Sequence, residues 1–152
     1  MGIIGGLPRL SSTKERINAY EQAVADCGLP ADSALVCYGD SMENSARTCL
    51  DQLLAEQCDA ILVSQGLMGA EVVMYLQEKG LVAGKDVQLV TFVDYVSEIS
   101  NLYADKLDCI IQPVEELGRV AGQQILKRIE TPDAPVFEQI LTSVYQPAPV
   151  IK

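Results

Sequence analysis

The fold of this chain is decided by the stretch Asp59-Ala60-Ile61-Leu62-Val63-Ser64, which is followed after two residues by a helical pattern from Leu67 to Lys79. The stretch is apolar on both faces, which is typical of a central strand in a parallel sheet covered by helices on both sides. Gly80 is placed to end the helix in the left-handed conformation. We therefore interpret residues 59–80 as one strand–helix unit of an α/β domain.

The same alternation of strand and helix runs through the first 93 residues. Apolar stretches at residues 3–7, 33–38 and 86–93 are expected to form further strands. The capping pattern Ser12-Thr13-Lys14-Glu15 predicts the start of one helix, and Asp40-Ser41-Met42-Glu43 predicts another. Four strand–helix units in series predict an α/β fold, a parallel sheet with helices on both faces, Rossmann-like or flavodoxin-like in arrangement.

The pattern changes after Val93. A polar stretch to residue 108 is followed by a brief extended piece and then by a helix that starts at Pro113. We divide the 152-residue domain into a core lobe at 1–93, a crossover segment with a helix at 94–135, and a return strand with a tail at 136–152. The helix is expected to carry one apolar stripe, made of Val114, Leu117, Ala121, Ile125 and Ile129.

Composition restricts the classes of function. The net charge of −10 and the pI near 4.3 oppose direct binding to DNA or to an anionic membrane surface. Apolar runs are too short to span a bilayer. Five cysteines, an odd number without a CxxC spacing, favour neither a disulfide framework nor a metal site, and we expect buried thiols in a cytoplasmic protein.

A ligand site is expected where the parallel strands end. In open α/β sheets, ligands bind beyond the carboxyl ends of the strands. The four loops at these ends are polar, and their hydroxyl, amide, carboxylate and guanidinium groups suit hydrogen bonding to a small polyhydroxylated molecule. The candidate ligand-binding residues are Ser12, Arg16, Asp40, Gln65 and Asp94.

Other interpretations of these residues stay open. Ser12 and Asp40 also fit the role of helix caps, and Arg16, Gln65 and Asp94 also fit solvated surface positions. Catalysis has little support, because the chain has no histidine and neither a GxSxG elbow nor a phosphate-binding glycine motif. We expect no enzyme, no catalytic residue, no cofactor and no metal, with a flavodoxin-like enzyme as one alternative.

Four segments in register resemble the LacI/GalR family of bacterial transcription regulators. Ser11–Tyr20 resembles S-x-x-T-x-x-R-x-x-G-[YF], and Cys58–Ala70 resembles D-A-[IV]-x-x-x-N-D-x-[ML]-A-x-G. Gly80–Phe92 resembles G-[LI]-x-[IV]-P-x-D-[IV]-x-[VI]-x-[GS]-[FY], and Ile110–Ala121 resembles T-x-[IV]-x-Q-P-x-x-x-[ML]-G-x-x-A. The resemblance covers nearly the whole chain, in the order that the family shows.

The resemblance implies a fragment: the C-terminal lobe of a periplasmic-binding-protein-like (type I) effector domain. The implied function is sensing of a small sugar-like effector by a homodimeric regulator that contacts DNA only through a separate helix-turn-helix and has no membrane partner. Arg16 matches the family's effector-binding arginine, and Ser12 matches the polar residue one turn earlier. Gln65 stands where the family has Asn or Asp, and the family's aspartate falls on Val93, beside Asp94. A periplasmic sugar-binding protein of the same architecture is the second alternative.

Overall fold

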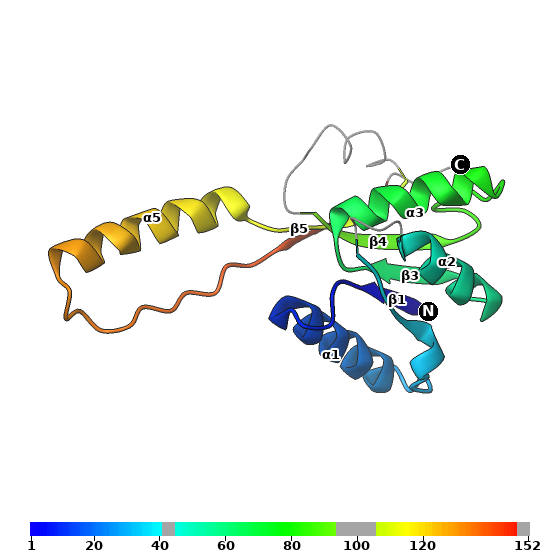
Figure 1. Ribbon diagram of the computed structural model, residues 1–152, viewed down its shortest axis with the longest axis horizontal. Coiled ribbons are helices and arrows are strands. Elements are labelled where there is room, and N and C mark those ends of the chain that lie inside the picture. Colours follow the sequence, from blue (N-terminus) through cyan, green and yellow to red (C-terminus); the bar gives the residue numbers. More distant parts are fainter. Residues whose placement is uncertain (41–44, 94–105, 149–152) are drawn as a thin grey trace.

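The computed structural model describes residues 1–40, 45–93 and 106–148, and it forms one lobe with a long projecting arm (Figure 1). The amino-terminal half alternates strictly between strands and helices, as the sequence pattern predicts. The elements are β1 (Gly2–Gly5), α1 (Ser11–Asp26), the 3-10 helix η1 (Ser33–Leu35), β2 (Val36–Tyr38), α2 (Ser45–Ala55), β3 (Ala60–Val63), α3 (Gly66–Glu78), β4 (Gln88–Val93), β5 (Asp108–Ile111), α5 (Val114–Glu130) and β6 (Val144–Gln146).

The sheet of the lobe has six strands in the order β2-β1-β3-β4-β5-β6. The first five are parallel, and β6 pairs antiparallel with β5 at the edge. The strand that decides the fold, β3, lies between β1 and β4, as its two apolar faces require. The predicted α/β class with a mainly parallel sheet is therefore confirmed, and one antiparallel edge strand is added to it.

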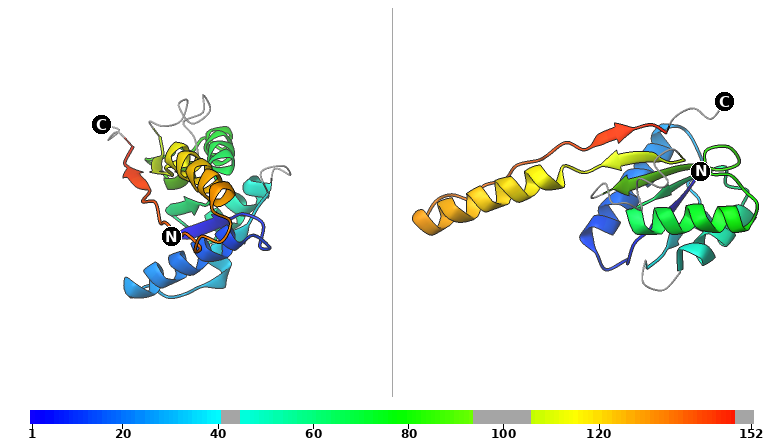
Figure 2. Two further views of the ribbon diagram at one scale, coloured as in Figure 1. Left: turned by 90° about the vertical axis from the view of Figure 1, so that its left-hand side faces the viewer. Right: turned by 90° about the horizontal axis from the view of Figure 1, so that it is seen from above.

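Helices cover both faces of this sheet (Figure 2). On one face α1 packs Ile17, Tyr20 and Val24 against Ile3 of β1. On the other face α2 and α3 bury a larger apolar cluster that includes Leu50 and Leu76, both fully buried. The two layers bring the amino-terminal ends of the helices to the edge where the parallel strands end.

Glycines end two of the helices, as expected, whereas the predicted cap of α1 is wrong. Gly28 and Gly80 follow α1 and α3 with positive φ angles of 69° and 75°. The helix α1 starts at Ser11 rather than after Ser12, with Leu10 at the cap position and no side-chain cap hydrogen bond. The carbonyl of Leu10 accepts the Lys14 N–H at 3.2 Å, which places Ser12 inside the first turn. The second predicted cap lies largely outside the described residues.

The carboxyl-terminal third forms an arm, which we define as α5 together with residues 131–143. The chain leaves the lobe after β5, runs out along α5 and returns beside it to β6 (Figures 1 and 2). Residues 108–111, which the sequence analysis grouped with the crossover segment, lie in the sheet of the lobe. The return strand expected after residue 135 is confined to β6 at 144–146, because in the described structure no neighbouring strand pairs with residues 136–143.

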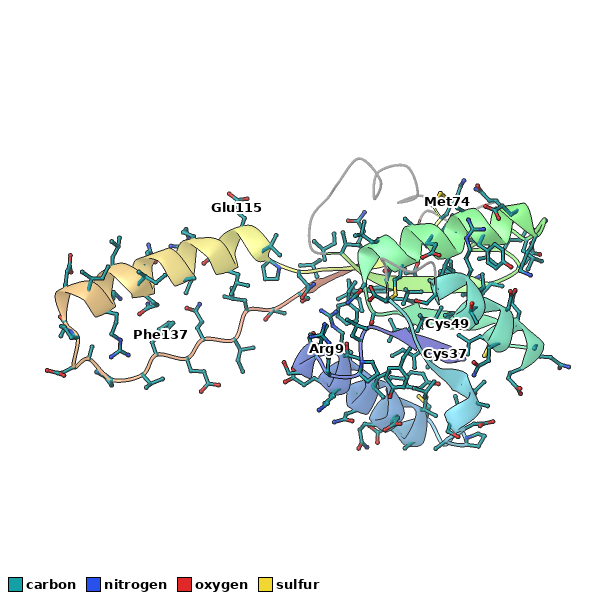
Figure 3. All side chains as sticks on the ribbon, in the orientation of Figure 1. Arg9, Cys37, Cys49, Met74, Glu115 and Phe137 are labelled. Carbon is teal, nitrogen blue, oxygen red and sulfur yellow. The ribbon has the colours of Figure 1, made fainter. Side chains whose placement is uncertain are left out.

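The arm does not fold back onto the sheet. Its apolar side chains are exposed instead, with Ile129 at 70%, Val136 at 90% and Ile140 at 88% of their surface accessible. Phe137 lies toward α5 and helps to line a shallow cavity beside Gln124 of that helix (Figure 3). Among the described helices, none combines the length and apolar character needed to cross a membrane.

Candidate functional site

The candidate site lies at the carboxyl edge of the sheet, where β1, β3, β4 and β5 end side by side. Strand pairing aligns Ile4 with Val63 and Val93 with Ile111, so the residues that follow these strands share one edge. This is the edge at which parallel α/β sheets bind ligands. The site is therefore built from short loops held by a rigid sheet.

Arg16 connects the ends of three strands. Its Nη1 donates to the carbonyl oxygen of Ser64 at 2.5 Å, and its Nη2 donates to Oε1 of Gln112 at 3.1 Å. The guanidinium carbon lies 4.1 Å from the centroid of the Phe92 ring. The side chain is half-buried, so this arginine is an ordered part of the edge rather than a solvated surface residue. Its flat ring contact and forked hydrogen bonds are a geometry that lysine does not reproduce.

Gln65 lies on the same edge as Arg16. It follows Ser64, whose carbonyl binds Arg16, and it occupies the position before α3 without making a side-chain cap hydrogen bond. Its amide nitrogen lies over the end of β1, 2.6 Å from the point where a Cβ on Gly6 would stand. The carbonyl of Gln65 also accepts a long hydrogen bond of 3.4 Å from Thr91 Oγ1. The structure therefore brings together two of the five predicted residues.

The other three predicted residues differ in how they are placed. Ser12 is exposed on α1, one turn before Arg16. Asp40 follows β2 and is half-buried, and its backbone exchanges hydrogen bonds with the hydroxyl of Ser45 at the start of α2. Asp94 lies outside the described residues.

Sequence reasoning missed Gln112 and Phe92 as members of this edge. Gln112 directly follows a parallel strand, so the rule that selected the other loops would have selected it as well. The short apolar pattern at 109–111 indicates only a brief extended piece of the crossover segment, so sequence reasoning does not place the end of a sheet strand before Gln112. Phe92 alternates with buried neighbours along β4, and its ring is half-exposed on the α1 face.

The side chains at this edge of the sheet are suited to binding a ligand through hydrogen bonds. The edge presents guanidinium and amide donors at Arg16 and Gln65, with carboxylate and hydroxyl groups at Asp40 and Ser12. The hydroxyl of Ser64 is buried and has no hydrogen-bond partner within the described part of the chain. Among the described residues, no three histidine, cysteine, aspartate or glutamate side chains are grouped so as to hold a metal ion.

A parallel α/β lobe with a polar carboxyl edge is the architecture of a ligand-binding lobe. The chain belongs to the family described as the periplasmic binding protein-like domain, whose pattern matches residues 1–146. The resemblance to LacI-type regulators, which the four sequence segments indicated, is confirmed by the relatives that the chain matches.

Two curated relatives and one solved structure illustrate the similarity of this chain to LacI-type regulators. The HTH-type transcriptional regulator CelR of Thermobifida fusca is 28% identical over 128 residues, which cover 83% of this chain and 37% of CelR. Catabolite control protein A of Priestia megaterium is 24% identical over 140 residues, covering 90% of this chain and 42% of that protein. A CelR–cellobiose complex superimposes with a TM-score of 0.85 at 25% identity, over 95% of this chain and 44% of the solved one. The chain thus spans about two fifths of the length of these curated relatives.

Proposed function

We propose that this chain is the carboxyl-terminal lobe of the effector-binding domain of a LacI-type transcription regulator. The observation that carries the proposal is the position of Arg16, half-buried at the carboxyl edge of the sheet with donors directed to the ends of β3 and β5. Gln65 on the same edge supports it. Relatives that are named as a transcriptional regulator and a transcriptional repressor support a sensing role over an enzymatic one.

The proposed effector is a small polyhydroxylated molecule of the carbohydrate class. Ser12, Arg16, Asp40 and Gln65 are its proposed partners in this lobe, and Asp94 stays a proposed partner from the sequence alone. Guanidinium, amide and carboxylate groups match sugar hydroxyls, which both donate and accept hydrogen bonds. The structural neighbour in complex with cellobiose is consistent with this class.

The arm is proposed to belong to a second lobe formed by other parts of a longer protein. Residues 137, 139, 141 and 143 line cavities against α5, whereas Ile140 between them lines neither cavity and is 88% exposed. This alternation is that of a strand covered by a helix on one face and awaiting a partner on the other. We further propose a cytoplasmic homodimer in which DNA is contacted by a separate part, since this lobe is strongly acidic.

A titration of the isolated chain with cellobiose, followed by amide chemical shifts, tests the proposed site. We expect weak binding, because a two-lobed site of roughly micromolar affinity (about −8 kcal/mol) loses charged contacts of about 1.5–3 kcal/mol each when one lobe is missing. The expected dissociation constant is on the order of millimolar. Shifts should concentrate at Ser12, Arg16 and Gln65.

Two variants sharpen this test. Arg16→Ala should abolish the shifts, whereas Arg119→Ala, which removes an exposed arginine of α5 that pairs with Glu116, should leave them unchanged. Repeating the titration with a panel of monosaccharides covers the rest of the class. If no sugar perturbs the carboxyl edge, or if the perturbed residues lie elsewhere, the proposed site is wrong.

A further inference from the structure

We propose that Gln112 is a positioning residue, which couples the state of the Arg16 site to the direction in which the arm leaves the lobe. The observation that supports this is the hydrogen bond between Arg16 on α1 and Gln112. Gln112 and Pro113 join β5 to α5, and we call them the root of the arm. The inference rests on the proposed function only in treating the Arg16 site as a ligand site. The coupling between Arg16 and the arm is testable without any ligand.

The first step of the argument concerns the guanidinium of Arg16. One planar group contacts the carbonyl of Ser64, the ring of Phe92 and the side chain of Gln112. Because the donors of a guanidinium point in fixed directions, a rotation that redirects one of them redirects the others. A molecule that turns this group toward itself therefore changes the hydrogen bond to Gln112 as well.

The second step concerns the place of Gln112 in the chain. It is the first residue after β5, and Pro113 and α5 follow it directly. Its backbone N–H donates to the carbonyl of Val93 at 3.0 Å, and its own carbonyl accepts from Val114 at 2.9 Å. The backbone of Gln112 is thus tied to β4, and its side chain is tied to α1 through Arg16. The side chain is a second attachment of the arm root to the lobe.

The third step concerns the space around the root. A cavity of about 190 Å³ adjoins Gln112 on the side of the arm, lined also by Pro113, Leu117, Gln139 and Ser143. Close-packed surroundings would hold α5 in one direction, whereas a cavity leaves room for it to turn. The arm projects away from α1, α2 and α3, so these helices do not hold it in place (Figure 1).

These three features define a small conformational device. With the Arg16–Gln112 hydrogen bond formed, both the backbone and the side chain of Gln112 attach the root to the lobe, and α5 keeps one direction relative to the sheet. When Arg16 turns toward a bound molecule, this side-chain hydrogen bond is lost and other directions become populated. A ligand shifts such an equilibrium only by its difference in affinity for the two states, and Arg16 supplies that difference because it takes part in both.

A distance measurement on the 152-residue chain tests the coupling. Nitroxide labels are attached to Cys27, the exposed cysteine at the end of α1, and to a cysteine introduced by Glu130→Cys at the last residue of α5. Pulsed electron paramagnetic resonance then reports the distance from the lobe to the tip of the arm. Labelled chain is diluted into an excess of unlabelled chain, so that distances between copies do not contribute.

Four single variants, and the double variant that combines Arg16→Lys with Gln112→Ala, are compared in this labelled background. Gln112→Ala should shift or broaden the distance distribution, and Arg16→Lys should produce the same change. Gln112→Glu, which keeps an oxygen acceptor for Arg16, should retain the original distribution. Gln139→Ala, which removes a glutamine from the same cavity but not from Arg16, is the matched control and should have no effect. Circular dichroism checks that each variant is folded.

The outcomes separate the coupling from the proposed function. If Gln112→Ala matches the original chain, or if Gln139→Ala changes the distribution equally, the coupling is overturned. If the double variant of Arg16 and Gln112 changes the distribution by the sum of the two single changes, the residues act independently and the coupling is again overturned. A failure of cellobiose and other sugars to bind, with the Gln112 effect intact, removes the proposed function and leaves the coupling standing.

Discussion

The side-chain amide of Gln65 occupies the space that a Cβ on Gly6 would need, since their separation would be 2.6 Å. Thr13 Oγ1 would lie 3.0 Å from the same Cβ. A glycine at the end of β1 is thus what allows Gln65 to lie across the edge of the sheet. The conflict involves the flexible end of a side chain, so it can be relieved by moving Gln65.

We therefore expect Gly6→Ala to change the site more than the stability. The free energy of unfolding should fall by no more than about 1 kcal/mol, the usual size of a change that a side-chain movement relieves. The side-chain amide resonances of Gln65 should move, and binding of cellobiose should weaken. Gly122→Ala on α5, where a Cβ meets nothing within 4 Å, is the control. It should leave the Gln65 amide resonances and the binding of cellobiose unchanged.

Two helical glycines should respond to alanine in opposite directions. A Cβ on Gly69 of α3 would stand 2.7 Å from Oγ1 and 3.0 Å from Cβ of the buried Thr91, so Gly69→Ala should destabilise the lobe by about 1–3 kcal/mol. A Cβ on Gly118 of α5 meets nothing within 4 Å, so Gly118→Ala should increase helix content and add about 0.5–1 kcal/mol to helix stability. Urea denaturation and circular dichroism measure the two effects. A stabilising Gly69→Ala would mean that α3 lies farther from β4.

The limits of sequence-based prediction follow from what each pattern encodes. Buried parallel strands and helix-ending glycines leave strong local signals, and β3, Gly28 and Gly80 are placed as predicted. The return segment at 136–143 has the composition of a strand but pairs with no strand among the described residues, and strand pairing is not a local property. Gln112 joins the site through an arginine 96 residues away in sequence, a contact that no local pattern contains.

One of the five thiols should react with a disulfide reagent in the folded chain. Cys27 is exposed, whereas Cys37, Cys49, Cys58 and Cys109 are buried. Burial raises the pKa of each of these four thiols, and that of Cys49, beside Cys37 between β2 and α2 (Figure 3), is raised to about 12. A thiolate is the reactive form, so buried thiols with raised pKa react slowly.

The measurement is a count of thiols titrated before and after unfolding. We expect one fast equivalent in the folded chain and five in denaturant. Cys27→Ser should remove the fast equivalent. Two or more fast equivalents in the original chain would show that the core around α2 opens readily, which the packing of Leu50 and Leu53 does not suggest.

The buried carboxyl of Glu71 should make the lobe less stable as pH rises. Burial raises its pKa, and Arg47, whose Nε lies 3.8 Å from Oε1, lowers the pKa only in part. Oε1 accepts no hydrogen bond within the described residues. Folding therefore favours the protonated carboxyl. As pH rises from the ordinary glutamate pKa of about 4.3 through the raised pKa, the buried carboxyl ionises and the free energy of unfolding decreases.

Glu71→Gln should remove this dependence. The variant should gain stability relative to the original chain as pH increases through that window, as measured by thermal unfolding at several pH values. Glu78→Gln is the matched control, since Glu78 binds the same Arg47 from an exposed position on α3. A difference between Glu71→Gln and the original chain that does not change with pH would contradict the assignment of the cost to ionisation.

The arm should cause the isolated chain to associate. Its apolar side chains form a surface of a kind that single soluble domains rarely expose. Exposed apolar patches larger than a few hundred Å² are usually sites where a partner binds. Val136 and Ile140 are the most exposed, and both lie on a segment whose backbone pairs with no strand in the described structure. Two copies can satisfy these groups by pairing arm to arm in a symmetric dimer.

Sedimentation velocity should therefore show a sedimentation coefficient that increases with concentration. Combining Val136→Lys with Ile140→Lys should abolish the increase, because two charges on the pairing face oppose association. Leu29→Lys, an equally drastic change at an exposed position of the lobe, should not abolish it. A monomer at every concentration in the original chain would show that the arm covers its apolar groups by itself.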